Sequence, residues 1–84
     1  DLSGYAATLD EMIEDLKRER LEKVKIRKKI EQSIRSLEDE DEQEVLRLRY
    51  ISGLSWEEVA VEIGYAWAQT HRIHSSALKN LKMI

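Results

Sequence analysis

The feature that most constrains the fold is the near absence of residues that break helices. The chain contains no proline and only three glycines, at positions 4, 53 and 64. The abundant Leu, Ile, Glu, Lys and Arg side chains lose little conformational freedom in a helix. The sequence therefore predicts an all-α protein, and 84 residues suffice for one small domain with an extension.

The first helix is expected to begin at Ser3 or at Thr8, which has capping-box spacing with Glu11, and to run to about Ser36. Its apolar residues follow a seven-residue rhythm, but Glu19 and Lys23 interrupt the seam in the middle. This interrupted heptad does not predict a strong coiled coil. The apolar positions of the rhythm are Leu9, Met12, Leu16, Ile26, Ile30 and Leu37.

The acidic run 38–42 is expected to be a junction, because like charges repel inside a helix but are stabilised at a helix N-terminus. Asp41 is expected to cap a second helix that ends at Gly53. Its inward residues are predicted to be Val45, Leu46 or Leu48, and Ile51.

A second capping box, Ser55 to Glu58, predicts a third helix with Val59, Ala60 and Ile63 facing inward. Gly64 can adopt the left-handed conformation of a tight turn. The last helix begins near Trp67 and extends to Lys82, with an inward stripe of Thr70, Ile73, Ala77, Leu81 and Ile84.

Two short helices joined by a glycine turn are typical of a helix-turn-helix, whose second helix lies in the DNA major groove. We therefore divide the chain into a long helix, residues 1–38, for dimerisation or packing, and a DNA-binding domain, residues 39–84. The predicted DNA-binding residues of the last helix are Trp67, Ala68, Gln69, His71, Arg72, Ser75, Lys79 and Lys82.

These side chains have different expected roles. Arg72 has the geometry to bind a guanine edge, whereas Lys79 and Lys82 are better placed for phosphates. The alternative is that these three basic side chains are simply solvated at the protein surface. Trp67 either covers the glycine turn or touches a sugar or thymine methyl, and packing is the favoured alternative. We expect Trp56 to be core and His74 to be a partly buried packing residue.

The distribution of charge favours DNA binding more than the net charge of −3 does. Residues 39–63 hold eight acids and two bases, whereas residues 64–84 hold three bases and no acid. We expect the acidity to be confined to parts that need not touch a polyanion.

Several other functions are not expected. The chain has no cysteine, and His71 and His74 have no acid or cysteine beside them on their helix, so no metal or cofactor is predicted. No phosphate loop or nucleophile constellation is present, so we do not expect an enzyme. No apolar run is long enough for a membrane span, and we expect a cytoplasmic protein.

The segments "DEQEVLRLRYISGLSWEEVAVEIGY" and "THRIHSSALKNL" resemble region 4 of sigma-70-type factors, and together with the long charged helix the chain looks like phage or prophage transcriptional regulators. The resemblance implies binding of promoter-like duplex DNA, together with contact to RNA polymerase. Factors that read −35 elements typically carry Arg-Glu at the positions of Trp67 and Ala68 and Gln at Arg72, so the resemblance does not extend to that DNA sequence. LuxR-type output domains share part of the pattern.

The long helix exceeds what one small domain can cover, so half of it must protrude. We expect Ile26, Ile30, Ile34 and Leu37 to cover the helix-turn-helix. The remaining apolar residues then form a homodimer interface, namely Leu9, Met12, Ile13 and Leu16. The alternatives are a helix that bends back on itself or an upstream segment that covers it.

Two functions from different classes remain. The first is a transcriptional regulator that binds double-stranded DNA. The second is an interaction module that docks on RNA polymerase or another protein, with the helix-turn-helix as a scaffold.

Overall fold

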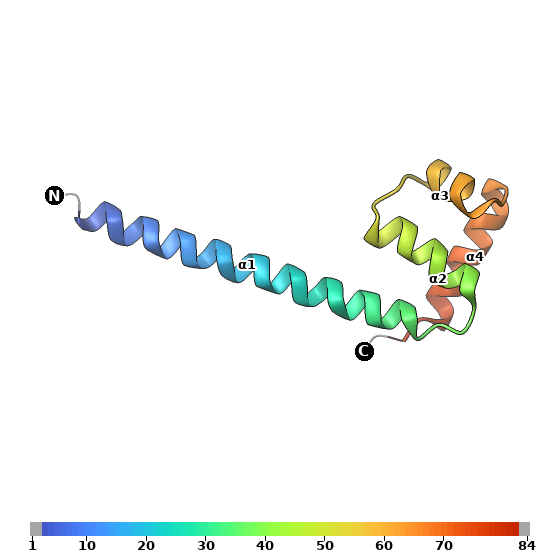
Figure 1. Ribbon diagram of the computed structural model, residues 1–84, viewed down its shortest axis with the longest axis horizontal. Coiled ribbons are helices and arrows are strands. Elements are labelled where there is room, and N and C mark those ends of the chain that lie inside the picture. Colours follow the sequence, from blue (N-terminus) through green and yellow to red (C-terminus); the bar gives the residue numbers. More distant parts are fainter. Residues whose placement is uncertain (1–2, 83–84) are drawn as a thin grey trace.

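The computed structural model describes residues 3–82, without the side chains of residues 3 and 5, and this range contains helices and no strand. In chain order the elements are α1 (Ser3–Arg35), α2 (Glu40–Leu46), the π-helix η1 (Arg47–Ile51), α3 (Trp56–Ile63) and α4 (Trp67–Asn80). The predicted all-α class with a long N-terminal helix is confirmed (Figure 1). Ile84 of the predicted inward stripe lies outside the described residues.

Helix α1 projects far beyond the short helices, and the molecule is 63 Å long but only 27 Å and 15 Å in the other two directions (Figure 1). Every described side chain from residue 6 to residue 29 is exposed. Exposed ion pairs one turn apart support this free part of α1, residues 6–29, such as Lys17–Glu14 and Arg18–Asp15, both at 3.4 Å. Such pairs each stabilise a helix by only about 0.3–0.5 kcal/mol.

The C-terminal end of α1 packs on the short helices. Ile34 and Leu37 are buried with Leu46 and Ala77, and Ile30 lies partly buried against this core. Ile26, which the sequence analysis also assigned to this cover, is 55% exposed, so that prediction is wrong. The short helices reach back along α1 only as far as Ile30, one helical turn beyond Ile26.

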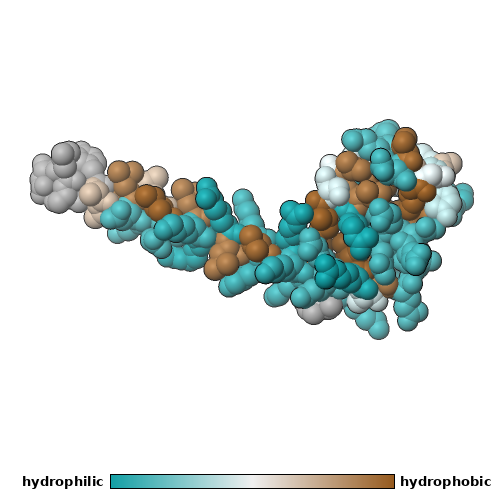
Figure 2. Space-filling model, viewed as in Figure 1, coloured by the Kyte–Doolittle hydropathy of each residue, from teal (hydrophilic) through white to brown (hydrophobic). Residues whose placement is uncertain are grey.

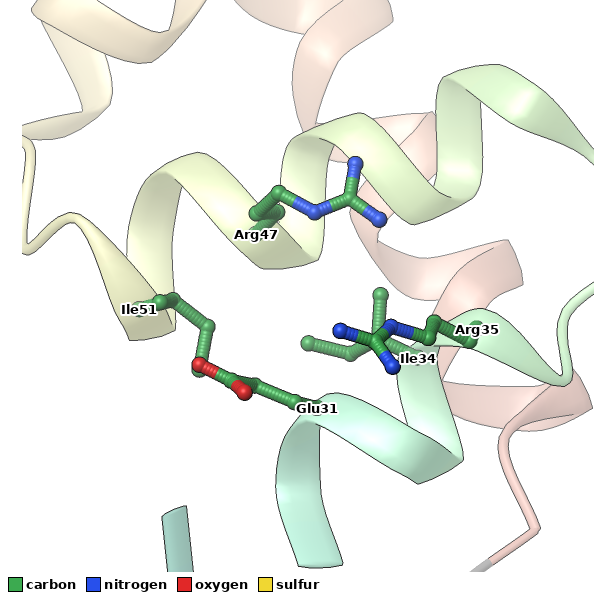
Figure 3. Close-up of a pocket in the computed structure, with 5 residues that line it drawn as sticks. All are labelled: Glu31, Ile34, Arg35, Arg47 and Ile51. Carbon is green, nitrogen blue, oxygen red and sulfur yellow. The ribbon is translucent and has the colours of Figure 1, made fainter. Parts of the chain in front are cut away.

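A small cavity separates the end of α1 from η1 (Figure 3). Its apolar lining comes from Ile34 and Ile51, and charged side chains at its edge complete it, namely Glu31, Arg35 and Arg47. Two of these charges are paired with nearby residues, Glu31 with Arg27 in α1 and Arg47 with Glu44 of α2. The junction between the two parts of the chain is therefore apolar inside and ionic at its rim.

Asp39, and not Asp41, caps α2. Its side chain accepts a hydrogen bond from the backbone amide of Glu42 at 2.9 Å. The predicted cap at Asp41 is wrong because the helix begins two residues earlier, so that Asp41 and Glu42 lie in its first turn. There they interact favourably with the helix dipole, and Glu42 becomes available to α4.

The second helix does not continue as an α-helix to Gly53. It widens after Leu46 into the π-helical turn η1, in which the backbone amide of Ser52 donates to the carbonyl of Arg47 at 3.0 Å. One extra residue per turn rotates the side chains that follow, and such turns often occur at functional sites. Gly53 then has a positive φ of 73°, as a glycine can.

Helices α3 and α4 are joined by the short turn at residues 64–66. The predicted capping box is confirmed, because Ser55 and Glu58 exchange hydrogen bonds of 3.2 Å. The predicted left-handed Gly64 is also confirmed, with φ 80°. No helix within residues 3–82 is long and apolar enough to cross a membrane.

Candidate nucleic-acid interface

Helix α4 has a buried side and an open side, as its periodicity predicts. Thr70 and Ala77 are completely buried, and Ile73 and Leu81 are half-buried. Five of the predicted DNA-binding residues are exposed on the open side, namely Trp67, Ala68, Arg72, Ser75 and Lys79. Helix α4 ends at Asn80, so the predicted end at Lys82 is two residues too long and Lys82 lies beyond the helix.

A shallow depression runs along the open side of α4. It brings together six of the eight predicted DNA-binding residues, and Ser76 completes it. Gln69 lies on the neighbouring side of the helix, and Lys82 lies at the far end beside Ser36 and Leu37. No acidic side chain lines the depression; its residues are Trp67, Ala68, His71, Arg72, Ser75, Ser76 and Lys79.

Tilted aromatic contacts join the beginning of α4 to Trp56 at the start of α3. The ring of His71 lies between two indoles, with its centroid 3.9 Å from that of Trp67 and 4.5 Å from that of Trp56. The Nε2 atom of His71 is buried and has no hydrogen-bond partner among the described residues. His71 thus forms the floor of the depression, and Trp67, which packs on it, is still 57% exposed. Trp56 is half-buried in this stack.

The π-helical turn adds two residues to this cluster. The Arg49 guanidinium lies 4.9 Å from the ring centroid of Trp56, and its Nη1 donates to the carbonyl of Leu54 at 2.8 Å. The Tyr50 hydroxyl lies 2.8 Å from Nε2 of His74, which is half-buried as predicted. Arg49 and Tyr50 therefore tie η1 to both α3 and α4.

An acidic edge borders the basic face of α4, which the sequence analysis did not expect. Asp39, Asp41 and Glu42 line a second depression together with Gln69 and Arg72. These acids lie beside α4 because α2 packs directly across it. Arg72 lies at the boundary, and its Nη1 donates to Oε1 of Gln69 at 3.2 Å.

Hydrogen bonds turn two of these acids toward the protein. Oε1 of the buried Glu42 accepts from the Ser76 hydroxyl and from the Asn80 amide, both at 2.8 Å. Oδ2 of Asp41 accepts from the Tyr65 hydroxyl at 2.7 Å. This hydrogen bond, and the charge of Asp41, raise the pKa of Tyr65 above its ordinary value. Asp41 therefore holds the turn before α4 through Tyr65, and Glu42 holds the second half of α4.

The stability of this cluster is expected to depend on pH through His74. Burial, then His71 and Arg49, lower the pKa of His74 below its ordinary 6.5, so the unfolded chain takes up this proton more readily. The contribution of His74 to the free energy of unfolding is therefore fully present well above pH 6.5 and is lost as the pH falls through 6.5 toward the lower pKa of the folded chain. Urea unfolding followed by tryptophan fluorescence at pH 7.5 and 5.5 measures this.

The control is His74→Gln, which removes the titrating group. We expect the variant to lose less stability than the parent chain over the same pH interval. Equal losses in both proteins would mean that His74 does not contribute.

Three residues that shape the site were not predicted from the sequence, namely Glu42, Arg49 and Tyr50. Glu42 carries a usable signal, because it precedes the buried Val45 and Leu46 by three and four residues and so shares their inward face. The other two depend on the π-helical turn, for which the sequence has no such signal.

The described residues contain no group of three His, Cys, Asp or Glu side chains that could hold a metal ion. No curated protein and no solved structure matches the chain significantly. A family model does match; it covers residues 5–82 and is described as "Protein of unknown function (DUF1492)". The match includes all of the short helices and nearly all of α1. The chain therefore belongs to the DUF1492 family.

Proposed function

We propose that this chain is a transcriptional regulator of phage or prophage type that binds double-stranded DNA in a bacterial cytoplasm, without catalysis. In this proposal α3, the turn at Gly64 and α4 form a sigma-70 region 4-like helix-turn-helix. The observation that carries it is the open side of α4, which presents Arg72 and Lys79 in a depression lined by no acid.

The dimensions of α4 suit the major groove. A helix with its side chains is about 10–12 Å across and the groove is about 12 Å wide. Arg72 lies in the first half of α4, the part that reaches deepest, where its guanidinium can bind O6 and N7 of a guanine. Lys79 lies about 10 Å further along the axis, where a phosphate is the expected partner. Small side chains at Ala68 and Ser75 leave room for base edges.

The Trp56–His71–Trp67 stack gives the face a rigid base. Because Trp56 of α3 packs on His71, the start of α4 is held in place before binding, so less backbone freedom is lost on binding. The exposed part of Trp67 is placed to touch a thymine methyl or a sugar.

Fluorescence anisotropy with labelled duplexes tests the proposal. Sequences selected from a random duplex pool should bind more tightly than a shuffled duplex, and binding should weaken steeply as salt is raised, because the protein displaces counterions. Absence of binding to any duplex at low salt would contradict the proposal.

A second candidate function is docking on RNA polymerase or another protein, and the exposed face of α3 favours it. Val61 is 79% exposed and shares a shallow depression with Leu54 and three acids, Glu57, Glu58 and Glu62. Such a surface suits a basic partner with an apolar contact. Val61→Asp should abolish that docking and leave duplex binding unchanged, which separates the two functions.

A further inference from the structure

The free part of α1 has an apolar stripe, Leu9, Met12, Leu16 and Ile26, that no other described part of the chain covers. Figure 2 shows exposed apolar patches along this helix. Leu9, Met12, Leu16 and Ile26 are between 52% and 58% exposed, although all are large apolar side chains. A helix in a protein gains most of its stability from packing such a face. A second surface is therefore needed, and its chemistry can be deduced from the charges beside the stripe.

The two halves of helix α1 carry opposite net charges. Residues 10–22 contain six acids and three bases, whereas residues 23–35 contain one acid and six bases. Two parallel copies would align acidic half with acidic half and basic half with basic half. Two antiparallel copies align each acidic half with a basic half, which lowers the electrostatic energy of the pair.

The two polar residues in the seam, Glu19 and Lys23, also favour the antiparallel arrangement. In a parallel pair Glu19 would face Glu19 and Lys23 would face Lys23, which is repulsive twice. In an antiparallel pair centred at the level of Leu21, Glu19 of each copy faces Lys23 of the other. The interruption of the heptad becomes two ion pairs, and a polar pair of this kind fixes register and orientation.

The same register joins apolar residues on either side of the centre. Leu16 of one copy meets Ile26 of the other, and Met12 meets Ile30, whose partly buried side chain marks the start of the folded end. At the centre of the pair, Arg20 lies near Arg20 of the second copy and Glu22 lies near Glu22 of the second copy. Both contacts are at the edge of the interface, where water screens the repulsion between like charges.

We propose that α1 forms an antiparallel homodimer through the seam Met12, Leu16, Glu19, Lys23, Ile26 and Ile30, with Glu19 of each copy paired to Lys23 of the other. The surface that covers the stripe is thus a second copy of this chain. The two sets of short helices lie at opposite ends of the paired helices. The dimer does not depend on DNA binding and is tested without DNA.

Disulfide trapping tests the orientation, and the chain has no cysteine of its own. Glu19→Cys and Lys23→Cys chains are mixed and equilibrated in a thiol redox buffer. The antiparallel dimer predicts that the mixture forms a linked species of twice 9.9 kDa as the main product, whereas either variant alone stays mostly unlinked. Efficient linkage of either variant with itself would indicate a parallel dimer and overturn the proposal. Absence of any linkage would indicate that α1 does not pair.

A matched pair of substitutions tests the seam in solution. Leu16 and Leu21 have the same exposed fraction, 52%, but Leu21 lies outside the seam. Leu16→Asp should halve the mass measured by light scattering at micromolar concentration, and Leu21→Asp should leave it at that of a dimer. Circular dichroism and tryptophan fluorescence check that both variants retain the fold. A monomeric parent chain, or dimers of both variants, would overturn the proposal.

Discussion

Replacing both Arg72 and Lys79 by alanine is expected to weaken binding to a selected duplex about 50-fold. An arginine on a guanine edge contributes about 1–3 kcal/mol, a phosphate contact adds to this, and each 1.4 kcal/mol corresponds to about a tenfold change in affinity. Both side chains are exposed, and alanine favours a helix, so the fold should not change. The measurement is the anisotropy titration over a series of salt concentrations.

The salt series separates the two contributions. Loss of a phosphate contact at Lys79 should reduce the slope of log K against log salt by about 1, whereas loss of a base contact at Arg72 should relax the sequence preference. The control is Lys17→Ala combined with Arg18→Ala, which removes the same amount of charge from exposed positions on the free part of α1. An equal loss of affinity in the control and in the double variant would mean that the effect is only a change in net charge.

Replacing Glu42 by alanine is expected to lower the free energy of unfolding of the short helices by about 2–3 kcal/mol. The buried carboxylate accepts hydrogen bonds from Ser76 and Asn80, and hydrogen bonds to charged groups stabilise a protein by about 1.5–3 kcal/mol. Urea unfolding should be followed by tryptophan fluorescence, since both tryptophans lie in α3 and α4, whereas circular dichroism is dominated by α1.

Glu44→Ala is the matched control for this prediction. It removes the same type of side chain from the same helix, but Glu44 forms only a half-exposed ion pair with Arg47. We expect a change below about 0.5 kcal/mol, as for most such pairs. Both variants are compared at one protein concentration, because self-association would shift the apparent stability. Equal destabilisation by the two substitutions would show that the Glu42 hydrogen bonds add nothing.

Local backbone chemistry could be predicted well from the sequence. Ser55, Glu58 and Gly64 act through hydrogen bonds and dihedral preferences within four residues of themselves, so their roles follow from spacing alone. The inward positions Val45, Val59, Thr70 and Ala77 follow from helical periodicity in the same way.

The remaining features depend on how the helices pack. Asp39 and Asp41 are both good caps, and the choice between them is set by the burial of Glu42 against α4. Ile26 fits the apolar rhythm, but the rhythm does not reveal where the short helices stop covering α1. The contact between His71 and Trp56 likewise joins two different helices, and helical periodicity does not reveal it.

Our central claim is that the open side of α4 binds duplex DNA, and chemical-shift mapping by NMR tests it most directly. A uniformly labelled chain is titrated with a selected duplex, and the backbone amide shifts are followed residue by residue. The account predicts that the largest changes lie between Trp67 and Lys79 and that the exposed face of α3 around Val61 changes little. Changes centred on Val61, or none at all at low salt, would contradict it.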